Sequence, residues 1–288
     1  MSMLLICSGV IALTGSVTNA FSLSYFIRRV ERTLCNQIFI MLNVFDLLVS
    51  LFDVIVVFFL FCGESIPICG RNTPYFKVAL FLFGVSIDST AFATCLLIVT
   101  RTISICYPFY QINKKAVQIA ALVFLIQEIL RLLLKLYAYY INTSRSVLSF
   151  CTEFENSLMI VLLSIVILVS LVSSILSAWK LLDNQQQLGV AQDSEDNQSP
   201  RTNRNQKAVI TILIVTILFC VLNSFFCIAA FLFVYHHGDT DKMSKLLPLY
   251  QFSLWIALPL NSAINPIIYF IRRKDMREYI KDLLPSFL

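Results

Sequence analysis

The chain has few charged residues and almost no histidine. Asp, Glu, Lys and Arg make up 14% of its 288 residues, and the two histidines are the adjacent His236 and His237. With a hydrophobic fraction of 58%, so few charges exclude a soluble globular domain and predict a membrane protein with several spanning segments. Both histidines fall in a predicted outer loop, so the apolar runs lack the base or metal ligand that a membrane hydrolase would use. We therefore expect no enzymatic activity.

Seven apolar runs are long enough to cross a bilayer as helices. The fourth is the weakest, because Glu128, Arg131 and Lys135 lie within it. We expect an all-α membrane protein in which residues 1–288 form a single domain, a seven-transmembrane helix bundle with a short amphipathic C-terminal helix. The predicted spans are about 3–27, 37–61, 75–107, 116–140, 158–182, 207–235 and 246–271, and the cytoplasmic helix is about 273–284.

Two other interpretations of these runs are weaker. The first run has no basic segment ahead of it, which disfavours a cleaved signal peptide. A small transporter is the alternative function, because Asp46, Asp53, Asp88 and Glu128 lie in apolar runs and could relay ions. Transporters of this kind are commonly built from internal repeats, and the sequence shows none.

Lysine and arginine are distributed unevenly over the loops. If the N-terminus lies outside, most of the 22 basic residues fall on the cytoplasmic side, as the positive-inside rule requires. The net charge of +5 is then a feature of the inner leaflet of the lipid bilayer and indicates no nucleic acid partner. We expect a multi-pass plasma-membrane protein with an extracellular N-terminus and a cytoplasmic C-terminus. The sequon at Asn142 lies in an outer loop and is expected to carry glycan.

Six of the nine cysteines lie in or beside the apolar runs, where a thiol acts as a small hydrophobic side chain. The other three, Cys62, Cys69 and Cys151, lie on the outer, oxidising side, and two of them are expected to pair. A bond between Cys69 and Cys151 would tie the second outer loop to the top of the third span. Cys62 is the other possible partner of Cys151.

Polar residues stand at fixed spacing in the seventh run, NSAINPIIYF. An unpaired polar group in hydrocarbon costs several kcal/mol, so these residues are expected to face protein or water. Pro266 removes a backbone hydrogen bond and kinks the helix, Asn265 can satisfy the freed groups, and Tyr269 can move between partners.

A second motif, TRTISICYPFYQINKK, occupies residues 100–115 at the end of the third run. A lone arginine at a membrane boundary is usually a snorkelling anchor, but Arg101 is followed by a loop that contains Pro108. With the seven runs and the Asn-Pro-x-x-Tyr pattern, these residues resemble the rhodopsin-like (class A) family of G protein-coupled receptors over nearly the whole chain. The resemblance implies a receptor that binds an extracellular ligand of unknown class and activates a heterotrimeric G protein.

The resemblance also implies roles for particular residues. Those implied for G-protein coupling and the activation switch are Arg101, Pro108, Asn265, Pro266 and Tyr269. A sodium site or a polar network without an ion is implied around Asp46, and both interpretations stay open. Its members are Asn19, Asp46, Thr90, Asn261, Ser262 and Asn265.

The ligand is expected in the outer half of the bundle, between the third, fifth, sixth and seventh spans. Phe83 stands where amine receptors place an aspartate, so a monoamine held there by an ion pair is disfavoured. Pro259 stands where retinal pigments have a lysine, which disfavours covalent retinal. Asp53 and Asp88 could instead bind a cation or pair with Arg131 or Lys135. The pocket residues implied are Asp53, Phe83, Ser86, Ile87, Phe226 and Trp255.

Several family features are missing. Thr100 and Thr102 replace the acid and the tyrosine beside the arginine. The sixth-span Cys-Trp-x-Pro motif appears as Cys220-Val221-Leu222-Asn223, Glu128 replaces the fourth-span tryptophan, and the fifth span has no proline. The cysteine of the third span would fall near Phe76, so Cys69 is displaced. We expect the fold to be kept, the activation relay to be altered and ligand-independent signalling to be appreciable. A receptor-shaped protein that has lost coupling is the alternative.

Overall fold

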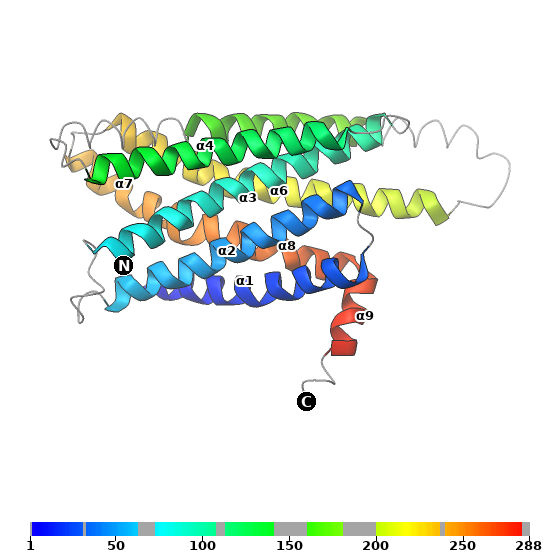
Figure 1. Cartoon of the computed structure of the whole chain (residues 1–288), viewed down its shortest axis with the longest axis horizontal. Helices are drawn as coiled ribbons and strands as arrows, with labels where there is room; N and C mark the ends of the chain where they lie inside the picture. The colour runs from blue at the N-terminus through cyan, green and yellow to red at the C-terminus, as the bar shows by residue number, and fades with distance from the viewer. Residues whose placement is uncertain are drawn as a thin grey trace.

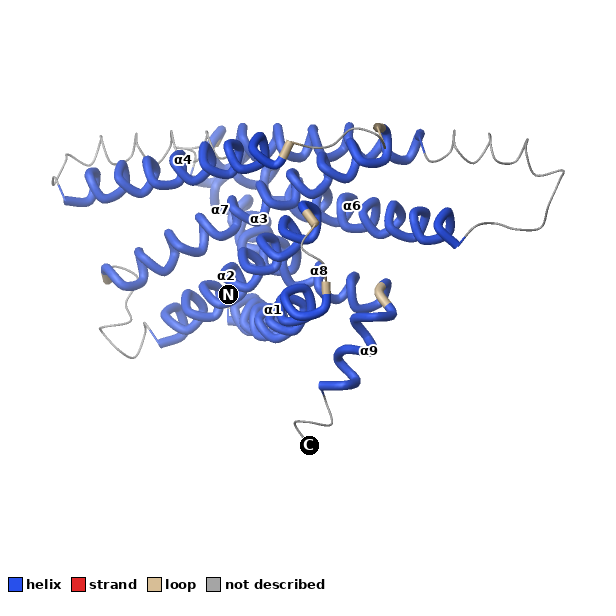
Figure 2. The backbone as a smooth tube through the Cα atoms, turned by 45° about the vertical axis from the view of Figure 1, so that its right-hand side comes forward, coloured by secondary structure: helices blue, strands red, loops and turns tan. Residues whose placement is uncertain are grey.

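The computed structural model describes residues 2–30, 33–62, 73–107, 113–140, 160–180, 200–236 and 240–283, nearly all of them helical (Figure 1). Long helices lie side by side, and α9 leaves the bundle at one end (Figures 1 and 2). The elements are α1 (Ser2–Arg29), α2 (Leu34–Cys62), α3 (Pro74–Cys106), α4 (Lys114–Tyr140), an unlabelled helix (Ile160–Lys180), α6 (Pro200–Tyr235), α7 (Thr240–Phe252), a π-helix (Ser253–Ala257), α8 (Leu258–Arg272) and α9 (Lys274–Leu283).

α7, the π-helix and α8 form one continuous helical rod, Thr240–Arg272. With this rod as the seventh helix, the predicted all-α, seven-helix bundle is confirmed. Among the described residues, six helices are long and apolar enough to cross a membrane. The weak fourth run, α4, is not among them. The largest differences from the predicted helix starts are at α6, which begins at Pro200 instead of 207, and at the last rod, which begins at Thr240 instead of 246. Polar residues continue both helices beyond the apolar run on which the prediction depended.

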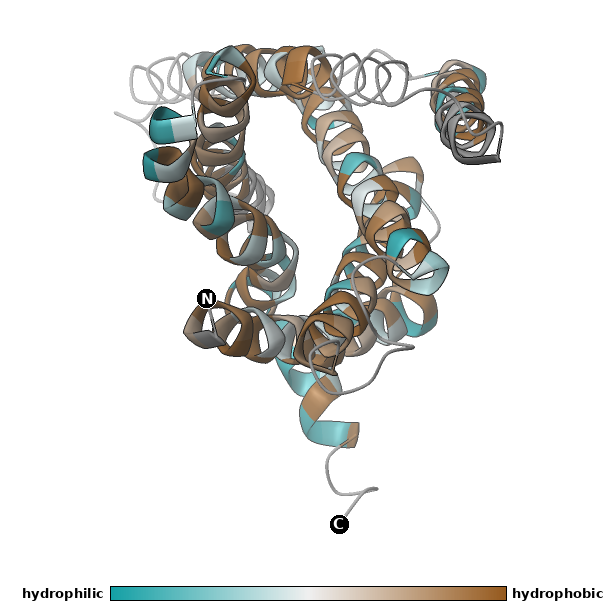
Figure 3. Cartoon of the chain, turned by 90° about the vertical axis from the view of Figure 1, so that its left-hand side faces the viewer, coloured by the Kyte–Doolittle hydropathy of each residue, from teal (hydrophilic) through white to brown (hydrophobic). Residues whose placement is uncertain are grey.

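Most positions along the helices are hydrophobic, as the predominance of brown in Figure 3 shows, and many large apolar side chains are exposed on the surface of the bundle. On α1, Val10, Leu13 and Val17 are exposed in one stripe at intervals of three and four residues, while Ser8 and Asn19 are fully buried. A soluble helix has the opposite arrangement. Polar groups inside and apolar groups outside fit a helix that packs against other helices in lipid. The chain is a multi-pass membrane protein.

Gly15 marks a close approach of three helices. A Cβ atom at this position would lie 2.5 Å from Ser50 Oγ on α2, 3.1 Å from Ala263 Cβ and 3.4 Å from Ala263 Cα on α8. Such contacts allow helices to pack at short distance where no hydrophobic force drives their association. A residue larger than glycine would therefore clash with α2 and α8 at this position.

The last rod widens at Ser253–Ala257, where the backbone is a π-helix and Leu258 N–H donates to Ser253 O five residues back. Pro259 follows directly. Its ring would clash with the carbonyl of Trp255, four residues earlier, and it has no N–H to donate. The wider turn relieves that clash, as π-bulges do in other helices. It also leaves Trp255 buried inside the bundle.

The buried apolar side chains form two clusters, one beside each half of α1. The Trp255 cluster lies beside the N-terminal half of α1 and includes Leu5, Val49, Phe83, Ile87, Phe226 and Trp255. The Tyr269 cluster lies beside the C-terminal half and includes Tyr25, Phe26, Phe39, Leu97, Tyr269 and Tyr279.

Candidate functional site

Pro266 leaves a backbone acceptor free, and a side chain from another helix binds it. Because proline has no N–H, the carbonyl of Ser262 four residues earlier lacks its helical donor. Asn19 Nδ2 on α1 donates to that oxygen at 3.2 Å and to Gly15 O on its own helix at 2.9 Å. The asparagine of the first helix thus compensates for the proline of the seventh, and this bond ties α1 to α8.

A buried carboxylate, that of Asp46 on α2, lies beside this link. Asn265 Nδ2 donates to Asp46 Oδ2 at 3.0 Å, which joins α2 to α8. The hydroxyl groups of Ser262 and Thr90 also face the carboxylate. Asp46 Oδ1 and Thr90 Oγ1 are fully buried and have no hydrogen-bond partner within the described part of the chain. Asn261 is buried next to Ser262.

These oxygens fit a cation. Carboxylate and hydroxyl oxygens are the donors that hard cations prefer, and a buried carboxylate needs a counter-charge or a proton. Among the residues that the structure describes, no three His, Cys, Asp or Glu side chains are grouped as a metal site. One carboxylate with neutral oxygens suits a monovalent ion such as Na⁺ better than a divalent ion, which usually takes several charged ligands.

Arg101 lies at the end of α3 against aromatic rings of the Tyr269 cluster. Its guanidinium carbon is 5.8 Å from the centroid of Phe39, and Tyr269 meets Phe39 edge-on with the ring centroids 5.2 Å apart. Arg101 Nε and Tyr269 Oη are both buried without a hydrogen-bond partner among the described residues. Two switch residues implied by the resemblance therefore share one aromatic neighbour.

The two threonines beside Arg101 contact other groups. Thr100 is buried, and its hydroxyl donates to Leu96 O at 2.8 Å and Leu97 O at 3.0 Å on its own helix. Thr102 Oγ1 lies 2.9 Å from Ser177 Oγ and 3.0 Å from Ser173 O. Thr102 therefore links α3 to the Ile160–Lys180 helix, and neither threonine supplies the negative charge that the family's acid would bring to the arginine.

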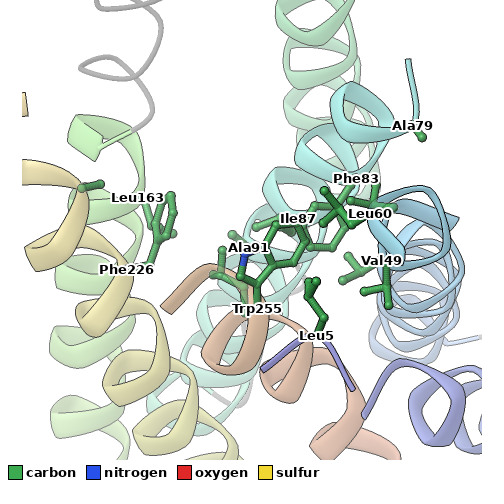
Figure 4. Close-up of a cluster of buried hydrophobic side chains, with 14 of the residues drawn as sticks. Leu5, Val49, Leu60, Ala79, Phe83, Ile87, Ala91, Leu163, Phe226 and Trp255 are labelled. Carbon is green, nitrogen blue, oxygen red and sulfur yellow. The ribbon is translucent and has the colours of Figure 1, made fainter. Parts of the chain in front are cut away.

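The six predicted pocket residues are all buried but lie in different places. Phe83 and Trp255 stack with their rings 10° from parallel and the centroids 6.5 Å apart, and Ile87 lies beside them (Figure 4). Figure 4 shows Phe226 on the other side of this view with Leu163. Ser86 donates to Leu82 O on its own helix at 2.7 Å.

The sixth pocket residue, Asp53, lies where α2 packs against α1. Ser8 Oγ on α1 donates to Asp53 Oδ2 at 2.9 Å, and Asp53 is fully buried. Its role in a ligand pocket stays a prediction. Asp88 and Glu128 each interact with another group of the chain.

α6 is continuous through the altered sixth-span motif. Asn223, which stands at the family's proline, is buried and donates from Nδ2 to Phe219 O at 2.8 Å. Unlike proline, asparagine retains its backbone N–H, so no kink is required at this position. In this chain the proline-linked distortion and the buried tryptophan both lie in the Thr240–Arg272 rod.

Several predicted residues lie outside the described part of the chain. Pro108, the glycosylation candidate Asn142 and the disulfide candidates Cys69 and Cys151 belong to this group, as do the side chains of Arg131 and Lys135. Cys62 is described and forms no disulfide bond with another described cysteine. Its possible pairing with Cys151, which lies outside the described residues, stays open. The bond between Cys69 and Cys151 stays a prediction.

Sequence reasoning missed the aromatic neighbours of the switch residues and the partner of Asp53. Phe39 is one of 24 phenylalanines in an apolar chain, so composition offers no signal that separates it from the others. Ser8 could have been found, because a serine in the first run is the kind of group that a buried acid requires.

Residues 19–269 match the family model described as "7 transmembrane receptor (rhodopsin family)". No curated protein matches the chain. The matched segment begins at Asn19 and ends at Tyr269, so it contains the polar network around Asp46, the end of α3 and the Asn-Pro-x-x-Tyr motif.

Proposed function

Because the chain belongs to the rhodopsin family of seven-transmembrane receptors, we propose that it is a G protein-coupled receptor of the plasma membrane. It binds an extracellular ligand at one end of the bundle and activates a heterotrimeric G protein at the other. Its N-terminus is extracellular and its C-terminus cytoplasmic. The observation that carries this proposal is the position of Arg101 at the end of α3, against Phe39 and close to Tyr269.

The proposed cytoplasmic end is the end where α9 leaves the bundle (Figure 1). Arg101, Arg273 and α9 lie there beside the Tyr269 cluster. Buried aromatic rings that pair with cations are contacts of about 0.5–2 kcal/mol each, small enough to break when a partner binds. This end can therefore change its contacts at modest cost, as activation requires.

The ligand contacts the opposite half of the bundle, at the Trp255 cluster. The stacked Phe83 and Trp255 rings and Ile87 give this region an apolar, aromatic character. Such side chains supply most of the contact area in small-molecule sites, while a few polar groups set orientation. The π-helix brings Trp255 into this cluster, and wide turns of this kind are frequent at functional sites.

The buried network around Asp46 binds Na⁺. Asp46, Thr90 and Ser262 supply oxygens, and Asn265 holds the carboxylate in place. The ion supplies the counter-charge that a carboxylate inside the bundle requires. Because the network joins α2, α3 and α8, a bound ion stabilises the arrangement in which these helices are close together.

Testing the function requires no known ligand. Cells that express the chain with a panel of heterotrimeric G proteins are expected to show ligand-independent nucleotide exchange on at least one of them. Arg101→Glu should abolish it, because the acidic side chain repels the surfaces that the arginine attracts. Arg28→Ala, which removes an exposed charge at the end of α1, is the matched control and should leave it unchanged. Expression at the cell surface without exchange on any G protein would favour a receptor-shaped protein that has lost coupling.

Sodium binding should appear as a cation-specific gain in thermal stability. At equal ionic strength, NaCl is expected to raise the melting temperature of the purified protein above its value in KCl. An ion at ten times its dissociation constant stabilises the folded state by about 1.4 kcal/mol. Asp46→Asn should remove the difference. Asp53→Asn, which changes an equally buried acid of the same helix, should retain it. Equal melting temperatures in the two salts would contradict the sodium site.

A further inference from the structure

Two guanidinium groups lie against a pair of stacked phenyl rings in the Tyr269 cluster. The rings of Phe26 and Phe39 are 9° from parallel with their centroids 5.3 Å apart. The guanidinium carbon of Arg101 is 5.8 Å from the centroid of Phe39, and that of Arg273 is 5.2 Å from the centroid of Phe26. These contacts run in series from α3 through α2 and α1 to the junction of α8 and α9.

Neighbouring side chains and the docking of α9 hold the two rings and their cations in place. Tyr269 meets both of them edge-on, at 86° to Phe26 and 89° to Phe39, an arrangement that places the positive ring edge against the negative ring faces. Arg273 is positioned by the docking of α9, because Tyr25 Oη donates to Asp275 Oδ2 at 2.8 Å. Phe39 is buried and has little freedom to reorient between these neighbours.

Arg101 has no acidic partner within the part of the chain that the structure describes. Arg29 pairs with Asp282 and Lys274 with Glu278, so these two ion pairs do not involve Arg101. The hydroxyl of Thr100 is used by the carbonyls of its own helix. Among the described residues, the negative face of Phe39 is a group that offers the guanidinium an electrostatic attraction.

We propose that Phe39 is a positioning residue that holds Arg101 in the resting state through this cation–π contact, in place of the acid that the family has beside its arginine. This role rests on the proposed function, since the resting state is defined by the absence of G-protein activation. The contact also connects the arginine to the seventh helix. Movement of Tyr269 away from Phe39 would leave the ring free to turn, and Arg101 would lose its partner.

The first test is basal activity. Phe39→Leu, normalised to surface level, is expected to raise ligand-independent nucleotide exchange about three- to tenfold, the ratio that corresponds to losing a cation–π contact at a partly buried site. Phe39→Tyr retains an aromatic face and should restore the wild-type value. A purely structural role of Phe39 would lower surface expression in both variants without raising exchange per receptor.

The second test needs no G protein. Melting temperatures of purified Phe39→Leu, Arg101→Met and the double variant form a thermodynamic cycle. The melting temperature of the double variant should fall by clearly less than the sum of the two single decreases, because either change alone removes the contact. The matched cycle of Phe26→Leu with Arg101→Met should be close to additive, since the guanidinium near Phe26 is that of Arg273.

The outcomes separate the two proposals. Coupling in the Phe39 cycle together with raised exchange supports the role of Phe39. Additive changes in melting temperature in the Phe39 cycle overturn that role, even if the protein activates no G protein at all. Coupling without raised exchange, in a receptor that does activate a G protein, overturns it as well, because the contact would then be structural.

Discussion

Thr100→Asp is expected to lower ligand-independent G-protein activation up to about tenfold at equal surface level. Thr100 cannot ionise, and its hydroxyl is bound to Leu96 O and Leu97 O. A carboxylate at this position would gain as a donor the buried Nε of Arg101, which has no hydrogen-bond partner among the described residues. A contact of about 1.4 kcal/mol that exists only in the resting state changes the ratio of active to resting receptor about tenfold.

The control separates charge from shape. Thr100→Asn has nearly the same volume as Thr100→Asp but no negative charge, so it should leave basal exchange near the wild-type value. Both variants are compared by nucleotide exchange per receptor at the cell surface. If the two variants give the same exchange, the carboxylate does not hold Arg101, and the missing acid has no consequence for the resting state.

The substitutions Phe39→Leu and Thr100→Asp are expected to act on the same arginine in opposite directions, so they should compensate each other. Phe39→Leu removes one contact that holds Arg101, and Thr100→Asp supplies another. The combined variant is therefore expected to have basal activity between those of the two single variants. The aromatic contact is weaker than a good ion pair at a buried site. This difference is the physical reason to expect appreciable basal activity in the wild type.

Much of the fold could be predicted because length and hydropathy alone determine whether a segment can span a bilayer. The seven runs correspond to the seven rods of the bundle. Helix ends were less predictable. Residues from Thr240 to Lys245 are mostly polar, yet they continue the last helix, because a helix that emerges from lipid needs no apolar residues.

The candidate site was predictable where a motif carries its own chemistry. Pro266 necessarily frees the carbonyl of Ser262, so an amide donor was expected there, but the expected donor, Asn265, was wrong, because Asn19 of α1 binds this carbonyl and Asn265 donates to Asp46. A buried acid such as Asp46 needs donors, and Asn265 is one of them. These arguments follow from single residues, so one sequence is enough to make them.

The aromatic contacts of Arg101 could not be predicted in this way. Phe26, Phe39 and Tyr269 come from three different helices, and their ring angles depend on how those helices pack. The π-helix is a similar case. Pro259 predicts a disturbed backbone, but either a kink or a wider turn would relieve the clash, and packing decides between them.

The close approach of α1, α2 and α8 at Gly15 leads to the second large effect, which is on stability. Gly15→Ala is expected to destabilise the folded protein by about 1–3 kcal/mol, the usual range for overpacking a tight interior. The added methyl group would meet Ser50 Oγ at 2.5 Å and Ala263 Cβ at 3.1 Å, so α1 must move away from α2 and α8. That movement would also stretch the bond from Asn19 to Ser262 O. A lower melting temperature and reduced surface level are the measurements.

Two further variants make this result specific to the contact. Gly84→Ala adds the same methyl group where no atom lies within 4 Å, so it should leave the melting temperature unchanged or raise it slightly through better helix propensity. Ser50→Ala removes the oxygen nearest to the added methyl group, and combining it with Gly15→Ala should recover part of the loss. The hydroxyl of Ser50 donates to Asp46 O on its own helix, so Ser50→Ala alone should lower the stability of the folded protein only slightly. A Gly15→Ala protein as stable as Gly84→Ala would mean that α1, α2 and α8 are farther apart than this packing requires, and the link from Asn19 to α8 would then be in question too.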